Sequence, residues 1–140
     1  MFKSGHYFYG LVFVFGLLLN ILWENLHSIL YVHYQGEIIS EAILLKASFF
    51  DALIICLLWG LAHKISARYQ VEILVAGSLL FAVILEIWAL GTNRWAYNEL
   101  MPLVPILKVG WSPTVQLAVT GTLSFGVTRA TIKLYVNKFK

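Results

Sequence analysis

Four long stretches of mainly apolar residues divide this chain, and short segments richer in polar residues separate them. A helix that crosses a membrane needs roughly 20 predominantly apolar residues. The fourth stretch is the most polar because it contains several Thr, Ser and Gly residues. The pattern predicts four membrane-spanning helices, approximately at residues 7–31, 42–62, 71–90 and 113–135.

The composition supports the same class of protein. Of 140 residues, 60% are hydrophobic and 12% are charged, whereas a typical soluble domain has about 25% charged residues. The first apolar stretch continues through Trp23 and no small-residue cleavage site follows it, which favours a retained helix over a signal peptide. We therefore predict an all-α, multi-pass integral membrane protein of the cell membrane, in which residues 1–140 form one four-helix bundle.

Basic residues predict how the helices are oriented. They precede the first predicted helix, lie between the second and third, and follow the fourth: Lys3, Lys64, Arg68, Lys133, Lys138 and Lys140. Cytoplasmic loops carry an excess of Lys and Arg, so both termini are predicted to be cytoplasmic and segments 32–41 and 91–112 to lie outside. The net charge is +3, but the basic residues form no stripe, and no nucleic-acid partner is predicted.

Acidic and amide side chains interrupt the apolar stretches at a similar depth. With a rise of about 1.5 Å per residue, Glu24, Asp51, Glu86 and Gln116 all fall in the outer half of the predicted bundle. Ionisable groups inside a membrane are costly and mark functional sites. A protonated buried carboxyl group can act as a general acid, so Glu24, Asp51 and Glu86 are the candidate catalytic residues. At least one of them is expected to be protonated at neutral pH or bound to a cation.

The first predicted helix shows a direction as well as a depth. Asn20, Glu24 and His27 are spaced i, i+4, i+7, which places them on one stripe that should face the bundle interior. The alternative is that such groups only hydrogen-bond between helices and hold the bundle together. Glu24 and His27 form a Glu-x-x-His motif, which di-iron bundles use twice. Because it occurs once here, no metal and no cofactor are predicted.

Segment 91–112 combines charged and aromatic residues with a short apolar run. Pro102 and Pro105 prevent a regular helix in that run. The segment is interpreted either as an interfacial belt of aromatic residues or as a lid over the polar pocket, in which Arg94 pairs with Glu86 or binds an anionic headgroup. The predicted ligand-binding residues are Asn20, Trp23, His27, Trp88, Arg94, Trp95, Tyr97 and Gln116.

The fourth predicted helix carries a face of small residues. Ala118, Thr122 and Gly126 recur at four-residue spacing, which lets helices approach closely. This face predicts a packing partner, either a second copy of the chain or a larger membrane complex.

The stretch Asn20-Ile-Leu-Trp23-Glu24, followed by Tyr31, resembles the N-x-x-W-E segment of the fungal membrane-bound meroterpenoid cyclases. The resemblance covers one helix, and those enzymes have more helices than this chain. It implies that Glu24 helps to protonate a polyprenyl substrate and that Asp51 or Glu86 stands in for a second acid. The chain is also similar in kind to the sterol-isomerase (emopamil-binding) superfamily and to small bacterial four-helix membrane proteins.

Three functions follow from these observations. The first is an isomerase or cyclase that uses a buried carboxylic acid on an isoprenoid or related hydrophobic molecule, with Trp23, Trp88 and Trp95 as walls that stabilise a carbocation. The second is a non-catalytic protein that binds a lipid or pigment or assembles a membrane complex. The third is a small dimeric transporter whose buried acids carry protons or cations.

Overall fold

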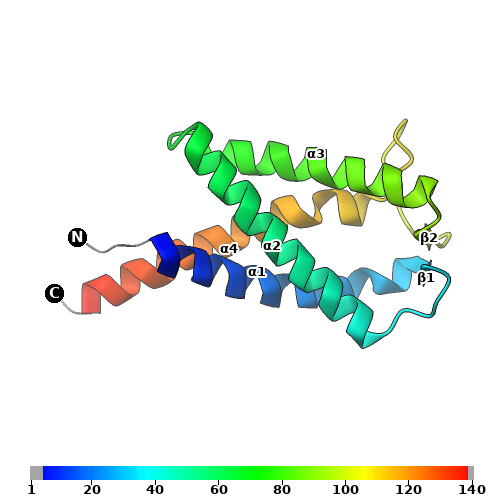
Figure 1. Ribbon diagram of the computed structural model, residues 1–140, viewed down its shortest axis with the longest axis horizontal. Coiled ribbons are helices and arrows are strands. Elements are labelled where there is room, and N and C mark those ends of the chain that lie inside the picture. The colour runs from blue at the N-terminus through cyan, green and yellow to red at the C-terminus, as the bar shows by residue number, and fades with distance from the viewer. Residues whose placement is uncertain (1–4, 139–140) are drawn as a thin grey trace.

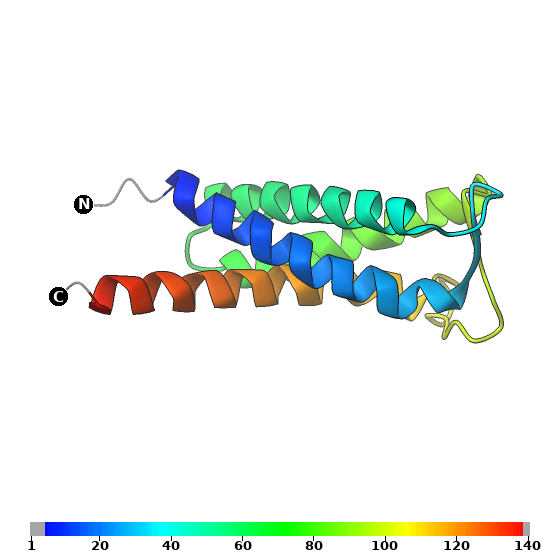
Figure 2. The same ribbon diagram turned by 90° about the horizontal axis from the view of Figure 1, so that it is seen from below.

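The structure is a computed structural model that describes residues 5–138, and it is a bundle of four antiparallel α-helices (Figure 1). The helices are α1 (Gly5–His27), α2 (Glu41–Ile65), α3 (Gln70–Gly91) and α4 (Trp111–Lys138). α1 begins and α4 ends at one end of the bundle, which we call the terminal end, and two short strands lie at the other, the sheet end (Figures 1 and 2). Lys3 and Lys140, which contributed to the predicted orientation, lie outside the described residues.

Three helical segments are long and apolar enough to cross a membrane: Gly5–Leu30, Glu41–Ile65 and Gln70–Gly91. This confirms three of the four predicted spans as helices of that kind. The fourth predicted span is a helix but does not have the same apolar character, and its membrane crossing stays a prediction.

The polar residues of α4 face the inside of the bundle. Gln116, Thr120, Ser124 and Thr128 follow one another at four-residue spacing, and each is buried. Residues four apart lie on the same side of a helix, so one polar stripe of α4 is covered by the other helices. The lower apolar content of α4 therefore reflects the stripe that it buries.

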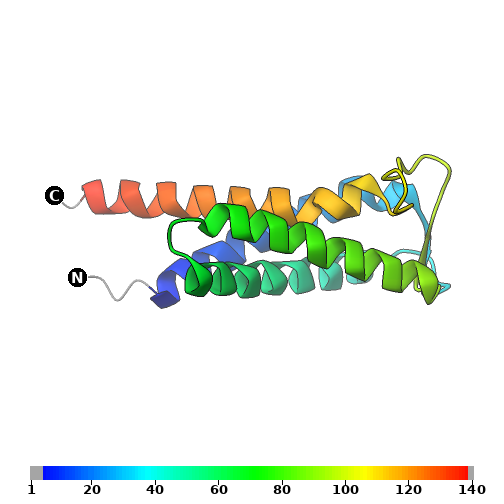
Figure 3. The same cartoon turned by 90° about the horizontal axis from the view of Figure 1, so that it is seen from above.

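Small residues let the helices pack closely around this stripe. A Cβ atom placed on Gly16 of α1 would lie 3.8 Å from Ala52 of α2, and one on Gly121 of α4 would lie 3.5 Å from Ile55. α2 packs mainly on α1 and α3 mainly on α4, whereas the seam between α2 and α3 is the loosest of the four between neighbouring helices. Figures 1 and 3 show the four helices, and in Figure 1 α2 and α3 separate toward the sheet end.

Two strands join the loops at the sheet end. β1 (Tyr31–Tyr34) pairs antiparallel with β2 (Trp95–Tyr97). The sequence prediction continued the first helix through Tyr31, but α1 ends at His27, and a short 3₁₀ turn leads into β1. The reason is local, because a run of aromatic and β-branched residues favours an extended chain. This sheet was not predicted, and it ties segment 32–41 to segment 91–112.

The small-residue face of α4 is divided between two environments. Ala118 is buried in the bundle, whereas a Cβ atom on Gly126 would meet nothing within 4 Å. A partner that packs against the part of this face around Gly126, either another copy of the chain or a different subunit, stays a prediction.

Candidate functional site

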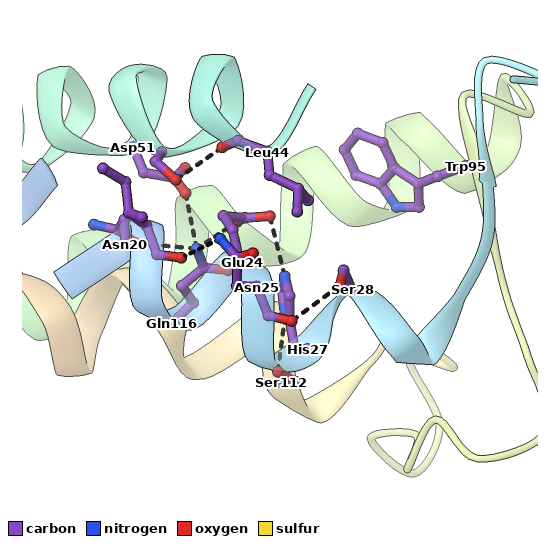
Figure 4. Close-up of polar contacts among 12 residues, drawn as sticks. Asn20, Glu24, Asn25, His27, Ser28, Leu44, Asp51, Trp95, Ser112 and Gln116 are labelled. Carbon is purple, nitrogen blue, oxygen red and sulfur yellow. Dashed lines mark hydrogen bonds and ion pairs between the residues drawn. The ribbon is translucent and has the colours of Figure 1, made fainter. Parts of the chain in front are cut away.

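The amide of Gln116 on α4 contacts side chains from α1 and α2. Its Nε2 atom lies 3.0 Å from Asn20 Oδ1, 2.6 Å from Glu24 Oε1 and 2.8 Å from Asp51 Oδ2. Figure 4 shows the three side chains converging on this amide. An amide nitrogen carries two hydrogens, so it cannot donate a full hydrogen bond to all three oxygens at once. Asn20, Glu24, Asp51 and Gln116, which were predicted to lie at similar depth or on one stripe, are therefore in direct contact. Their oxygen acceptors outnumber the two hydrogens of the amide.

The second oxygen of Glu24 contacts His27. Glu24 Oε2 lies 3.2 Å from His27 Nε2, and the other ring nitrogen, Nδ1, lies 2.9 Å from the hydroxyl of Ser112. His27 is buried, and Ser112 is outside the cavity lining. The hydroxyl of Ser112 therefore orients the histidine ring, and the ring in turn orients Glu24. Ser112 was not predicted, since a single serine at the start of a helix carries no distinctive spacing.

Glu86 is held separately, by residues of β2. Its Oε2 atom accepts hydrogen bonds from Trp95 Nε1 at 3.2 Å and from the hydroxyl of Tyr97. The Tyr97 oxygen also accepts the backbone N–H of Gly110 at 2.9 Å. Tyr97 thus links Glu86 to the far end of the loop that precedes α4.

The predicted pair between Arg94 and Glu86 does not form. The Arg94 guanidinium instead lies over the ring of Trp88, 4.8 Å from its centroid, and the donors to Glu86 are Trp95 and Tyr97. Alternate side chains of a strand point to the same face. Trp95 and Tyr97, at alternate positions of β2, therefore reach Glu86 together, whereas Arg94 precedes the strand and lies over Trp88.

Two tyrosines at the sheet end remain neutral well above physiological pH. Burial raises the pKa of Tyr97 above its ordinary value, and the neighbouring Glu86 carboxyl group adds to the shift. Burial, and then Glu86, also raise the pKa of Tyr31. Both phenols therefore keep their protons near neutral pH, and Tyr97 can act as a hydrogen-bond donor to Glu86.

Replacement of Tyr97 by phenylalanine is expected to lower stability at pH 7 by about 1–2 kcal/mol, because Glu86 loses a donor. The variant should also lose less stability than the wild type above pH 10. In the wild type the unfolded chain releases the Tyr97 proton at about pH 10, below the pKa of the folded state, so stability falls as the pH rises from there.

Thermal unfolding in detergent, followed by helical circular dichroism at pH 7 and pH 11, measures both effects of the Tyr97 change. Tyr7→Phe is the matched control, because Tyr7 is 83% exposed. The expectation would be contradicted if the wild type and Tyr97→Phe lost the same amount of stability between pH 7 and pH 11.

A cavity of about 720 Å³ lies between α2 and α3 at the sheet end, within the roughly 300–1,000 Å³ typical of small-molecule sites. Glu24, Asp51 and Gln116 lie on its surface, and Glu86 faces it from α3. Apolar side chains of α2 and α3 form the walls: Ile43, Leu44, Ala47, Phe50, Ala82, Leu85 and Trp88.

Exposed side chains line the cavity on both helices of the loose seam, which indicates a lateral opening there. Phe50 of α2 and Trp88 of α3 both line it, and they are 48% and 47% exposed. α2 and α3 are both apolar enough to cross a membrane, so the surroundings of this opening in a bilayer would be lipid chains. The geometry suits a hydrophobic molecule that arrives from the side.

Aromatic rings close the cavity at the sheet end. Tyr31, Tyr34 and Trp95 all line it, and the rings of Tyr34 and Trp95 are stacked with centroids 6.0 Å apart. Of the segment interpreted as a lid, Arg94 and Trp95 line the cavity, whereas the proline-containing part does not. The cover is therefore built from both loops.

The structure sorts the predicted ligand-binding residues into three groups. His27, Trp88, Arg94, Trp95 and Gln116 line the cavity. Asn20 and Tyr97 stand behind it, each bonded to a lining residue. Trp23 does not line it, and its indole N–H has no hydrogen-bond partner among the described residues. Phe50 also lines the cavity but was not among the predicted ligand-binding residues, although its position next to Asp51 in the sequence could have indicated it.

Within residues 5–138, no group of three or more His, Cys, Asp or Glu residues is arranged to hold a metal ion. No protein-family model, curated protein or solved structure matches this chain.

Proposed function

We propose that this protein binds a hydrophobic molecule of the isoprenoid class within the membrane and isomerises or cyclises it by proton transfer. The observation that carries the proposal is the position of the Glu24 and Asp51 carboxyl groups on the surface of a cavity with apolar walls that opens through the α2–α3 seam. A carbon–carbon double bond is a weak base, so its protonation requires a positioned acid shielded from water.

The hydrogen-bond count supports a proton shared by the two carboxyl groups. Gln116 supplies two amide hydrogens to three oxygens, and Glu24 Oε1 and Asp51 Oδ2 lie on the same nitrogen, at 2.6 and 2.8 Å. A proton held between Glu24 and Asp51 satisfies the remaining contact. The same proton is the one that the pair would donate.

The proposed reaction moves one proton on and one proton off. The carboxyl pair protonates one alkene carbon, and the neighbouring carbon becomes a cation. Aromatic faces of the lining, among them Phe50 and Trp95, stabilise that cation. The carboxylate left behind then removes a proton from another carbon, which gives an isomer or, after ring closure, a cyclic product of unchanged mass. His27 beside Glu24 orients the pair.

A non-catalytic lipid- or pigment-binding role is the second candidate. It is favoured by the fact that Glu24, Asp51 and Glu86 all have hydrogen-bond partners inside the bundle, as groups with a structural role require. In this case the molecule bound in the cavity is released unchanged.

Mass spectrometry of the small molecules that co-purify with the detergent-extracted protein tests the proposal. The wild type is expected to carry a defined isoprenoid. Ala47→Trp, which places a large ring in the α2–α3 seam, should retain about 10–100-fold less of it, because overpacking costs about 1–3 kcal/mol. Incubation of the wild type with the identified molecule should yield a second species of identical mass and different chromatographic mobility.

Ala76→Trp on the exposed surface of α3 is the matched control, since Ala76 is outside the cavity lining. A bound molecule without the second species would support the binding role and refute catalysis. A wild type that carries no defined molecule would refute both.

A further inference from the structure

Two cationic side chains from different elements line the cavity at exposed positions. Lys46 belongs to α2 and Arg94 follows α3, and both are exposed and line the cavity. Among the described residues, the ion pair found is that between Glu24 and His27, so neither cation is neutralised by a carboxylate of residues 5–138. Cations placed in this way can bind an anionic group of a ligand.

Arg94 is held in place for such a role. Its backbone N–H donates to Ala89 O at 2.8 Å, and its own carbonyl accepts the N–H of Gln35, so the residue is fixed to both α3 and the turn after β1. The guanidinium carbon lies 4.8 Å from the centroid of the Trp88 ring. A cation–π contact of this kind does not use the N–H donors, and the planar set of donors of arginine matches the oxygens of a phosphate.

Lys46 lines the cavity from α2. It is five residues before Asp51 on α2, roughly 7.5 Å along the helix axis, and a lysine of this length can run along an apolar wall while its ammonium group remains at the surface. Glu37 also lines the cavity at an exposed position. We call these three exposed residues, Glu37, Lys46 and Arg94, the rim, and its two cations and one acid give it a net positive charge.

The charges of the cavity are therefore ordered from rim to interior. Lys46 and Arg94 lie at the rim, whereas the carboxyl groups of Glu24, Asp51 and Glu86 lie inside. An anionic group is attracted to the rim and repelled from the interior, and an uncharged chain can follow the apolar walls inward. This order selects an amphiphile with a defined direction of binding.

We infer that the substrate is a lipid with an isoprenoid chain and a phosphate headgroup, bound with its phosphate between Lys46 and Arg94 and its chain extending toward the Glu24–Asp51 pair. The inference rests on the proposed function and names its substrate class. The phosphate serves to position the lipid, and its ester bond is not broken. The double bonds closest to the headgroup then lie nearest to Asp51.

Binding of farnesyl monophosphate and of farnesol to the full-length protein in nonionic detergent tests this inference, with quenching of tryptophan fluorescence as the readout. Farnesol has the same chain without the phosphate. The wild type is expected to bind the phosphate about tenfold more tightly, as a charge-assisted hydrogen bond implies. Lys46→Gln and Arg94→Gln should each reduce this preference, and the double variant should remove it while farnesol still binds.

Lys64→Gln and Arg68→Gln at the terminal end are the matched controls, because they remove the same charges far from the cavity. Inorganic phosphate should compete only weakly, since it lacks the chain. Equal affinities of the wild type for the two probes would overturn the inference and leave the proposed function in place. A double variant that loses farnesol binding as well would also overturn it, since the cations would then maintain the cavity. Binding of neither probe would refute the isoprenoid site itself.

Discussion

Replacement of Gln116 by leucine is expected to lower the stability of the bundle by about 3–5 kcal/mol, the range found when a buried charged group loses its partner. Leucine is close to glutamine in size, so packing changes little. The loss comes from Glu24, Asp51 and Asn20, whose oxygens all contact the Gln116 Nε2 atom. Without that amide, two carboxyl groups face one another inside the protein.

Unfolding in increasing concentrations of a denaturing detergent, followed by circular dichroism, measures this effect. Gln70→Leu is the matched control, because the Gln70 amide also contacts a side chain, that of His63, but at an exposed position, where surface changes cost about 0.5 kcal/mol or less. Adding Asp51→Leu to Gln116→Leu should recover part of the loss, since it removes one of the opposed carboxyl groups. Equal stabilities of the two single glutamine variants would show that the cluster does not behave as a buried network.

Replacement of Glu24 by glutamine is expected to reduce the rate of the proposed reaction by about 10²–10⁴-fold, the usual contribution of a general acid. Glutamine preserves the shape of the side chain and its contacts with His27 and Gln116, but its amide cannot donate a proton to an alkene. Stability should change far less than the rate. The rate is measured as the appearance of the isomeric product from the molecule that co-purifies with the wild type.

Glu72→Gln at the terminal end of α3 is the matched control for charge, since Glu72 is exposed and remote from the cavity. A Glu24→Gln variant that keeps the wild-type rate would exclude Glu24 as the acid. A variant that loses its rate and its fold together would assign Glu24 a structural role, and the binding alternative would then be preferred.

The helices and the carboxyl cluster could be predicted because both depend on local regularities. Apolar stretches of spanning length give three of the helices directly. The fixed rise of a helix relates sequence position to depth, which is why Glu24, Asp51 and Gln116 were expected at one level and are found in contact. The polar character of α4 was also visible, but not that its polar stripe would be covered by its neighbours.

The sheet and the partners of Glu86 could not be predicted in the same way. β1 and β2 are separated by two complete helices, and strand pairing over such a distance leaves no periodic signal in either segment. Once the strand is known, its alternation explains why Trp95 and Tyr97 both reach Glu86, and Arg94, which precedes the strand, contacts Trp88 instead. The predicted Arg94–Glu86 pair treated the segment as an irregular loop and therefore missed this alternation.

The pairing of Tyr34 with Trp95 closes residues 34–95 into a ring whose last link is made by hydrogen bonds. α2 and α3 form its two long sides, the connection at residues 66–69 forms one end, and the sheet forms the other. The seam between α2 and α3 is therefore bounded on all sides by this closed ring of chain. If the protein acts as proposed, this closed ring gives a lipid one lateral route between α2 and α3, so product would leave before the next substrate enters by the same route.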